Sequence, residues 1–136
     1  MAVLSRQIYV NLPVKDLNAS KAFFKAIGFE FNMQFSDEKA ACLVVGENIF
    51  AMLLQEEYFR TFTNKDIADT SKSTEVLIAI SADSREDVDG IASRAIAAGA
   101  KSNGSIDHGF MYQTSFDDLD GHTWEVAYMD PSALEG

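Results

Sequence analysis

The stretch IYVNLPVKDLNASKAFFKAIGFEF, residues 8–31, joins a strand pattern to a helix pattern. Apolar residues alternate with others over residues 8–14, which is the period of a half-buried β-strand. Asp16 or Asn18 can cap the helix that follows, and Gly28 suits the C-terminal end of that helix. Two phenylalanines then begin another apolar segment. The stretch therefore predicts the order strand, helix, glycine, strand.

The same order recurs in EVLIAISADSREDVDGIASRAIAAGAK, residues 75–101. An apolar strand over residues 76–80 is followed by Ser84, a natural helix N-cap, and the helical spacing of apolar residues ends at Gly99. Because the order occurs twice, the chain predicts an internal repeat. Each copy continues with two apolar strands joined by a turn, at residues 40–45 and 49–54 and at residues 110–116 and 123–129.

The repeat predicts one α+β domain, residues 1–136, built from two βαβββ modules at residues 5–55 and 75–130. The segment between the modules, residues 56–74, is polar and longer than an ordinary connection. We expect it to act as a linker or as a lid over a pocket, and a short helix within it is an alternative.

The amino-acid composition indicates which kinds of molecule the protein is not expected to bind. The chain of 136 residues has 11 basic and 21 acidic residues, a net charge of −10. Such a surface disfavours nucleic acids and anionic membranes, which need clustered Lys and Arg. Cys42 is the single cysteine, so the chain forms neither an internal disulfide nor a zinc cluster of cysteines. Without an export signal or an apolar run of membrane length, we expect a cytoplasmic protein.

Two motifs resemble those of a known family. VKDLNASKAFFKAIGF, residues 14–29, is similar to the opening signature of the vicinal oxygen chelate superfamily, which includes glyoxalase I, bleomycin-resistance proteins and extradiol dioxygenases. DLDGHTWEV, residues 118–126, resembles the closing motif D-P-D-G-x-x-x-E of that family, with Leu119 where Pro is usual. The resemblance implies that the two modules form an open barrel-like pocket. It also implies a homodimer.

The resemblance further implies four metal-ligand positions, on the first and last strand of each module. Here they are occupied by Tyr9, Ala51, Leu77 and Glu125. Ala51 and Leu77 have no donor atom, and a catalytic divalent ion usually takes about three protein ligands. We therefore expect no metal cofactor. If Zn, Ni, Mn or Fe were bound, Glu125 would hold it, with Glu75 as an alternative second carboxylate.

Strand alternation predicts which side chains face the pocket. We expect the opposite faces of the strands to lie beneath the helices, with Phe50 and Met52 among the covered residues. Gln113 could supply a polar contact to a ligand. The predicted ligand-pocket residues are Asn11, Ala51, Leu53, Leu77, Ala79, Gln113 and Thr123, together with Tyr9 and Glu125.

Three residues are candidates for catalysis: Glu125, Tyr9 and His108. A desolvated carboxylate such as Glu125 is a candidate general acid or base, and Tyr9 is the best partner for it. His108 is either a general base or a loop histidine bonded to Asp107 or to the backbone. His122 falls in a predicted hairpin turn, where we expect it to be exposed.

Three functions are compatible with these residues. The first is metal-free binding of a small organic molecule in the barrel pocket, as in bleomycin-resistance proteins. The alternative is a metal-dependent lyase or isomerase resembling glyoxalase I (lactoylglutathione lyase). An extradiol dioxygenase ranks lowest, because no two histidines can join Glu125 in an iron(II) triad. Accordingly, we expect the purified protein to hold no stoichiometric divalent metal.

Overall fold

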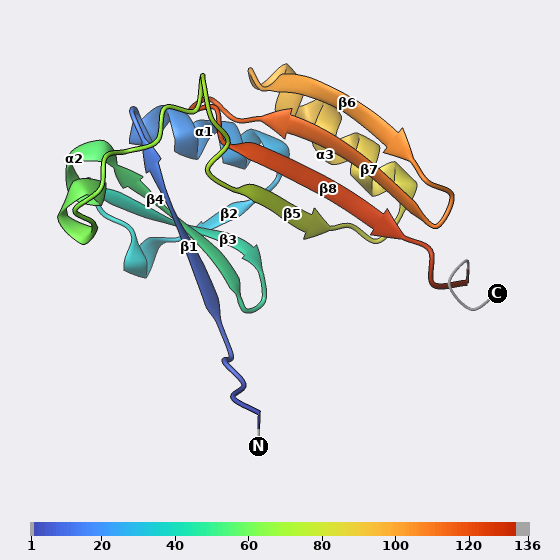
Figure 1. Cartoon of the computed structure of the whole chain (residues 1–136), viewed down its shortest axis with the longest axis horizontal. Coiled ribbons are helices and arrows are strands. Elements are labelled where there is room, and N and C mark those ends of the chain that lie inside the picture. Colours follow the sequence, from blue (N-terminus) through green and yellow to red (C-terminus); the bar gives the residue numbers. More distant parts are fainter. Residues whose placement is uncertain (1, 133–136) are drawn as a thin grey trace. The chain divides into compact units, whose positions relative to one another are not determined.

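Two βαβββ modules make up the structure, a computed structural model that describes residues 2–132 (Figure 1). The chain divides after Ile67 into two compact units, and each unit holds one module. The predicted α+β fold class is confirmed. The elements of the first module are β1 (Ile8–Val14), α1 (Leu17–Ile27), β2 (Glu30–Asn32), the 3₁₀ turn η1 (Met33–Phe35), β3 (Ala40–Gly46) and β4 (Ile49–Gln55). Those of the second are β5 (Leu77–Ser81), α3 (Arg85–Ala97), β6 (Lys101–Asp107), β7 (Met111–Asp117) and β8 (Thr123–Met129).

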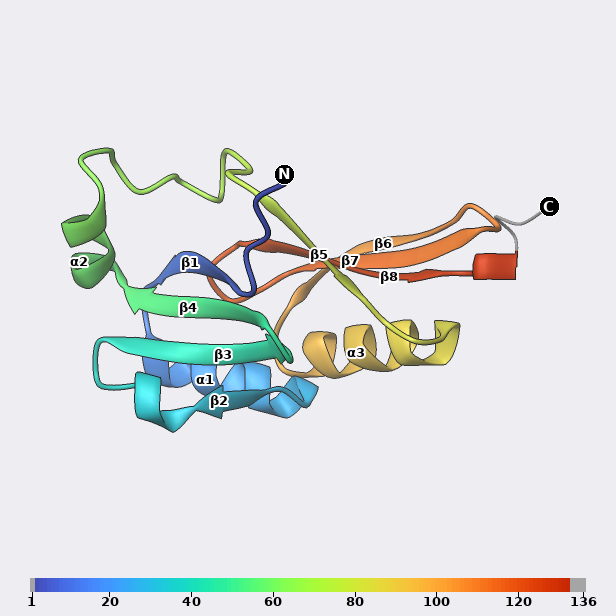
Figure 2. The ribbon, with the colours of Figure 1, turned by 90° about the horizontal axis from the view of Figure 1, so that it is seen from below.

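Each module forms one four-stranded sheet, with the order β1-β4-β3-β2 in the first and β5-β8-β7-β6 in the second. The first and last strands of each module pair in parallel, and the remaining pairs are antiparallel. The parallel pair needs a crossover, which the helix of each module supplies. Figure 2 shows α1 lying along one side of the first sheet.

Local capping explains where the two long helices begin and end. The Asp16 side chain accepts a hydrogen bond from the Ala19 N–H at 3.1 Å, and Ser84 accepts one from Asp87 N–H at 3.0 Å. Gly28 ends α1 with φ of 122°, a conformation that favours glycine. The predicted helices are thus confirmed. No helix in the described part of the chain is long and apolar enough to cross a membrane.

The predicted faces of β4 are wrong. Ala51 and Leu53, expected to face the pocket, are only 2% and 0% exposed and pair in register with Val10 and Leu12 of β1. They therefore lie on the covered face of the sheet. The run IFAMLL is apolar on both faces, so its alternation carries no signal, and the parallel register decides the faces instead.

Phe50 and Met52 of β4 consequently share a face with Tyr9 and Asn11. The Tyr9 and Phe50 rings stack with centroids 5.0 Å apart. Both residues of that pair are at least partly exposed. The open face of the first sheet is therefore more aromatic than the sequence predicted.

The faces predicted for the second sheet are confirmed. Trp124 and Val126 of β8 are 1% and 0% exposed and form a core with Phe116 of β7. The neighbouring residues of β5 and β8 lie on the opposite, open face, where Leu77 pairs with Thr123 and Ala79 pairs with Glu125. The alternation of buried and open positions gives β8 the clear period of a strand with one covered and one solvated face.

The segment between the modules begins with two short helical turns, α2 (Glu56–Phe59) and the 3₁₀ turn η2 (Arg60–Phe62). A short helix was the alternative expected there. Farther along, the Thr70 hydroxyl donates a hydrogen bond to the Asp120 carbonyl at 2.6 Å. The segment is thus attached to the β7–β8 turn within the second unit. Its service as a lid stays a prediction.

Candidate functional site

An open cavity of about 410 Å³ lies on the open face of the second sheet. All of its lining residues belong to the second unit, and most of them come from β5, β6, β7 and β8. A cavity of this size suits a small organic molecule. The lining residues are Thr74, Leu77, Asn103, Gly104, Ile106, Gln113, Ser115, Asp117, Thr123 and Glu125.

Glu125 stands on the floor of the cavity. Strand register places it between Ala79 on β5 and Ser115 on β7, and Gly104 on β6 follows Ser115. These neighbours are small, so space is left around the carboxylate. Glu125 is half-buried, and its carboxylate has no hydrogen-bond or ion-pair partner among the described residues. A partly desolvated charge without a partner is costly, which makes Glu125 the foremost candidate for contact with a ligand.

Apolar side chains stand on both outer strands of the sheet. Leu77 on β5 is 56% exposed and Ile106 on β6 is 50% exposed, and both line the cavity. Gln113, the register partner of Ile106, adds an amide that is half-buried. The cavity thus combines two large apolar side chains with a mostly polar lining, which gives a ligand apolar contact at the outer strands and several hydrogen-bonding groups between them.

Asp117 holds one rim of the cavity through its Oδ1 atom. Asn103 Nδ2 donates to this oxygen at 2.9 Å and the Thr123 hydroxyl donates to it at 2.8 Å. The Asn103 amide also donates to Ser115 Oγ at 3.3 Å. These bonds fix the rim before a ligand arrives.

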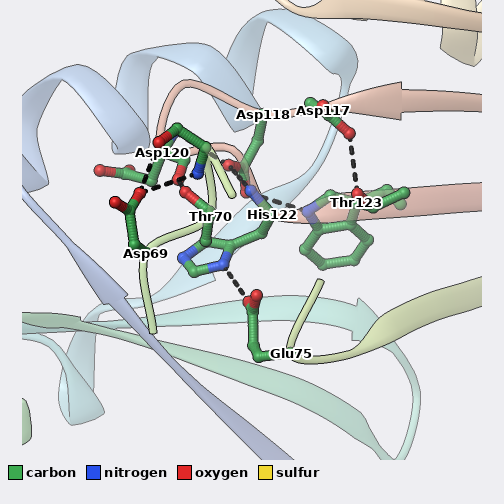
Figure 3. A network of polar contacts seen from close by, with 10 residues as sticks. Asp69, Thr70, Glu75, Asp117, Asp118, Asp120, His122 and Thr123 are labelled. Carbon is green, nitrogen blue, oxygen red and sulfur yellow. Dashed lines mark hydrogen bonds and ion pairs between the residues drawn. The ribbon is translucent and has the colours of Figure 1, made fainter. Parts of the chain in front are cut away.

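The turn between β7 and β8 is organised by Asp118 (Figure 3). Asp118 Oδ1 accepts the backbone N–H groups of Asp120 at 2.9 Å and His122 at 3.0 Å, and Oδ2 accepts the Trp124 indole N–H at 3.0 Å. Burial raises the pKa of Asp118, while His122 and the donated hydrogen bonds oppose that rise. The first residue of the closing motif therefore has a structural role, because it sets the start of β8 and hence the position of Glu125.

His122 is 1% exposed, so its predicted exposure is wrong. Its Nδ1 lies 2.6 Å from Glu75 Oε1. Figure 3 shows the two side chains facing each other. The hydrogen bonds to Asp118 shape the turn, and the ring contacts Glu75 in the segment that precedes β5. Glu75, the alternative metal ligand, is thus engaged by His122 and is not among the residues that line the cavity.

Tyr9 and Asn11, the candidates from the first unit, have partners within that unit. The Tyr9 hydroxyl donates to Gln7 Oε1 at 2.8 Å, and the Asn11 amide donates to the Tyr9 carbonyl at 3.3 Å. Tyr9 and Glu125 belong to different units. Their pairing stays a prediction.

His108 lies in the exposed turn between β6 and β7. Its backbone N–H donates to the Met111 carbonyl at 2.8 Å. The carboxylate of Asp107, one of its predicted partners, instead receives Arg85 at 2.7 and 3.1 Å and the Gly109 N–H at 2.9 Å. His108 is not among the residues that line the cavity, and a catalytic role for it stays a prediction.

The Arg85 guanidinium, followed by the Gly109 N–H, lowers the pKa of Asp107 to about 2. Replacing Arg85 with Gln is expected to raise this pKa toward the ordinary value of 3.8. The pair contributes stability above pH 3.8 that is lost as the pH falls toward 2, because the folded-state pKa is the lower one. An NMR titration of the Asp107 carboxyl carbon measures the change. Arg6→Gln is the matched control, and equal titration curves in the two variants would contradict the assignment.

The four positions at which the superfamily holds its metal do not fit a metal in this chain. Ala51 and Leu77 carry no donor atom, and Ala51 points to the covered face of its sheet. Glu125 alone is a carboxylate. Among the described residues, no group of three His, Cys, Asp or Glu side chains is placed to hold a metal ion. The donor set therefore gives no basis for a metal-dependent step.

Sequence reasoning missed the contributions of β6 and of the strand end at Asp117. Asn103, Gly104 and Ile106 line the cavity, yet no strand pattern marked the polar stretch KSNGSID. Ser115 and Asp117 could have been found, because they alternate with the apolar Phe116 on β7. Applying the alternation of β8 to the adjacent strand β7 places Ser115 and Asp117 on the open face of the sheet.

Comparisons with known proteins agree with this architecture. Residues 6–46 match the sequence model of the family described as bleomycin resistance protein-like N-terminal. No curated protein matches the chain. A hypothetical protein from S. aureus is 24% identical and has a TM-score of 0.78, with 93% of this chain and 95% of that chain covered.

Two further solved structures are similar. A glyoxalase/bleomycin resistance protein/dioxygenase family enzyme from Burkholderia phytofirmans is 20% identical over 89% of this chain and 96% of that chain, with a TM-score of 0.73. TnmS3, an antibiotic binding protein from Streptomyces, is 18% identical over 95% of this chain and 99% of that chain, with a TM-score of 0.67. The predicted resemblance is confirmed: residues 6–46 match the bleomycin resistance protein-like N-terminal model, and the chain has the same fold as solved structures named glyoxalase/bleomycin resistance protein/dioxygenase.

Proposed function

We propose that this protein binds a small organic molecule on the open face of the sheet β5-β8-β7-β6, without the metal ion of its metal-dependent relatives. The observation that carries the proposal is the cavity of about 410 Å³, which is lined by the Glu125 carboxylate, a group without a hydrogen-bond or ion-pair partner among residues 2–132. Apolar residues on the outer strands would contact the body of the ligand, and the polar groups between them would orient it.

The relatives support binding as a function of this fold. TnmS3 is described as an antibiotic binding protein, and the family matched by residues 6–46 takes its name from bleomycin resistance. The proposal includes the homodimer that the resemblance implies. A lyase or isomerase resembling glyoxalase I is the alternative, because Glu125 occupies a ligand position of those enzymes. That alternative requires a metal, for which the remaining positions supply only the Tyr9 phenol, since Ala51 and Leu77 have no donor atom.

Binding of a small probe molecule, with and without a substitution that fills the cavity, tests the proposal. The probe is 1-naphthalenemethanol, a neutral aromatic alcohol, titrated calorimetrically into protein treated with a chelator and dialysed. We expect the probe to bind without added metal. Replacing Ser115 with Leu should weaken binding at least about tenfold, because the larger side chain occupies space beside Glu125. Ser93→Leu, on the exposed side of α3, is the matched control and should bind like the parent protein.

Two outcomes would reject metal-free binding at this site. One is binding that appears only after Zn, Ni or Mn is added and that disappears with the chelator. The other is binding that is absent, or that Ser115→Leu and Ser93→Leu leave equally strong. Circular dichroism of each variant confirms that the fold is retained before binding is compared.

A further inference from the structure

The charges that line the cavity have one sign. Asp117 and Glu125 are carboxylates, and no Lys, Arg or His is among the ten described residues of the lining. We propose that the ligand is an organic cation, such as a protonated amine on an apolar body. This inference rests on the proposed function and specifies the chemical class of the ligand.

Glu125 is the group that would bind the positive charge. Its carboxylate is half-buried and has no partner in the described part of the chain. Coulombic attraction is stronger there than in bulk water, because part of the surrounding volume is protein. A hydrogen bond between an ammonium group and a carboxylate is also stronger than one between neutral groups. A cation would therefore offset the cost of holding this carboxylate away from water.

Asp117 adds to the negative electrostatic potential in the cavity, and hydrogen bonds hold its side chain in place. Both donors to its Oδ1, from Asn103 and Thr123, keep it on the rim, two positions along the same strand from Ser115. Lys101 is its register partner on β6, but the ammonium group forms no ion pair among the described residues and does not line the cavity. The positive charge of Lys101 can partly offset the negative charge of Asp117. Glu125 is therefore the residue that determines the preference for a cationic ligand.

An anionic ligand would meet repulsion at short and at long range. Within the cavity it would face two carboxylates, and around the chain the net charge is −10. A neutral ligand with a hydroxyl group could donate a hydrogen bond to Glu125, but it would bring no positive charge to the carboxylate. The geometry thus orders three ligand classes, with the cation first, the neutral molecule second and the anion last.

Three probes with the same aromatic body test this order: 1-naphthylmethylamine, 1-naphthalenemethanol and 1-naphthylacetic acid, which at pH 7 are a cation, a neutral molecule and an anion. We expect the amine to bind about tenfold more tightly than the alcohol, the gain typical of one charge-assisted hydrogen bond. Binding of the acid should be weakest. Added salt should weaken binding of the amine and leave binding of the alcohol nearly unchanged.

The variant Glu125→Gln keeps the shape of the side chain and removes its charge. It should abolish the preference for the amine while the alcohol binds within about threefold of its original affinity. Glu47→Gln, in the exposed β3–β4 turn, is the matched control and should leave all three affinities unchanged.

The outcomes separate this inference from the proposed function. If the alcohol binds and the amine binds no more tightly, the cation preference is wrong and the binding function stands. If the preference persists in Glu125→Gln, a different group selects the charge and the inference is overturned. If none of the probes binds, the proposed function fails as well.

Discussion

Replacing Asp118 with Ala is expected to lower the free energy of unfolding by about 3 kcal/mol, because three donors lose their acceptor. Two of these donors, the His122 N–H and the Trp124 indole N–H, belong to residues that are 1% exposed, so water reaches them poorly. Urea unfolding followed by fluorescence measures the loss. Trp124 is the single tryptophan and reports directly on this turn.

Two other variants define the origin of the effect. Asp118→Asn keeps one carbonyl oxygen but turns an amide toward a donor, so we expect an intermediate loss of about 1–2 kcal/mol. Asp83→Ala removes a carboxylate elsewhere in the same unit and should change stability little. A loss in Asp118→Ala no greater than that in Asp83→Ala would mean that the turn does not depend on Asp118.

The pH dependence of the Asp118→Asn variant gives an independent check. Burial raises the pKa of Asp118 above the ordinary 3.8, so the folded state binds its proton more tightly than the unfolded state does. The stability that this proton provides is present below pH 3.8 and is lost as the pH rises through the folded-state pKa. Asparagine does not titrate. The difference in unfolding free energy between the parent protein and Asp118→Asn should therefore be larger at acidic than at neutral pH.

Features set by neighbouring residues could be predicted from the sequence. Asp16, Gly28 and Ser84 mark helix ends because caps act over three or four residues. The residues predicted for β8 agree with the structure from Thr123 to Met129. There the alternation is clear, since one face of the strand packs on the core and the other is open.

Features set by distant residues could not be predicted. His122 is buried, and its ring contacts Glu75, a residue 47 positions earlier in the chain. The covered side of Ala51 follows from the parallel register of β4 with β1, which an apolar run on both faces does not reveal. The cavity likewise needs β6, whose polar sequence gives no strand signal.

The closing motif DLDGHTWEV combines two roles that the sequence presents as one. Asp118, Gly121 and His122 hold the turn through bonds to their own unit, and these residues explain most of the motif. Glu125 takes no part in that network. The Glu125 side chain instead lines the cavity, and the turn fixes the position of this residue on β8.

Replacing Gly121 with Ala tests the structural role of the turn. We expect this replacement to lower the free energy of unfolding by about 3 kcal/mol. Gly121 has φ of 80°, which an L side chain adopts at a cost of about 1–2 kcal/mol. A Cβ atom would also overlap Thr70 Oγ1 and lie 2.9 Å from Thr70 Cβ. The crowding would displace Thr70 from its hydrogen bond to Asp120 and add about 1–2 kcal/mol.

Gly109 supplies a matched control, since its φ is 83° and an added Cβ atom would meet nothing within 4 Å. Gly109→Ala should therefore show the backbone cost alone, about 1–2 kcal/mol. Removing the Thr70 side chain in a Thr70→Gly background should reduce the cost of Gly121→Ala to that of Gly109→Ala, a non-additivity that a double-mutant cycle measures. Equal costs for the two glycine variants in the parent protein would show that Thr70 does not crowd the turn, because only crowding distinguishes the two sites.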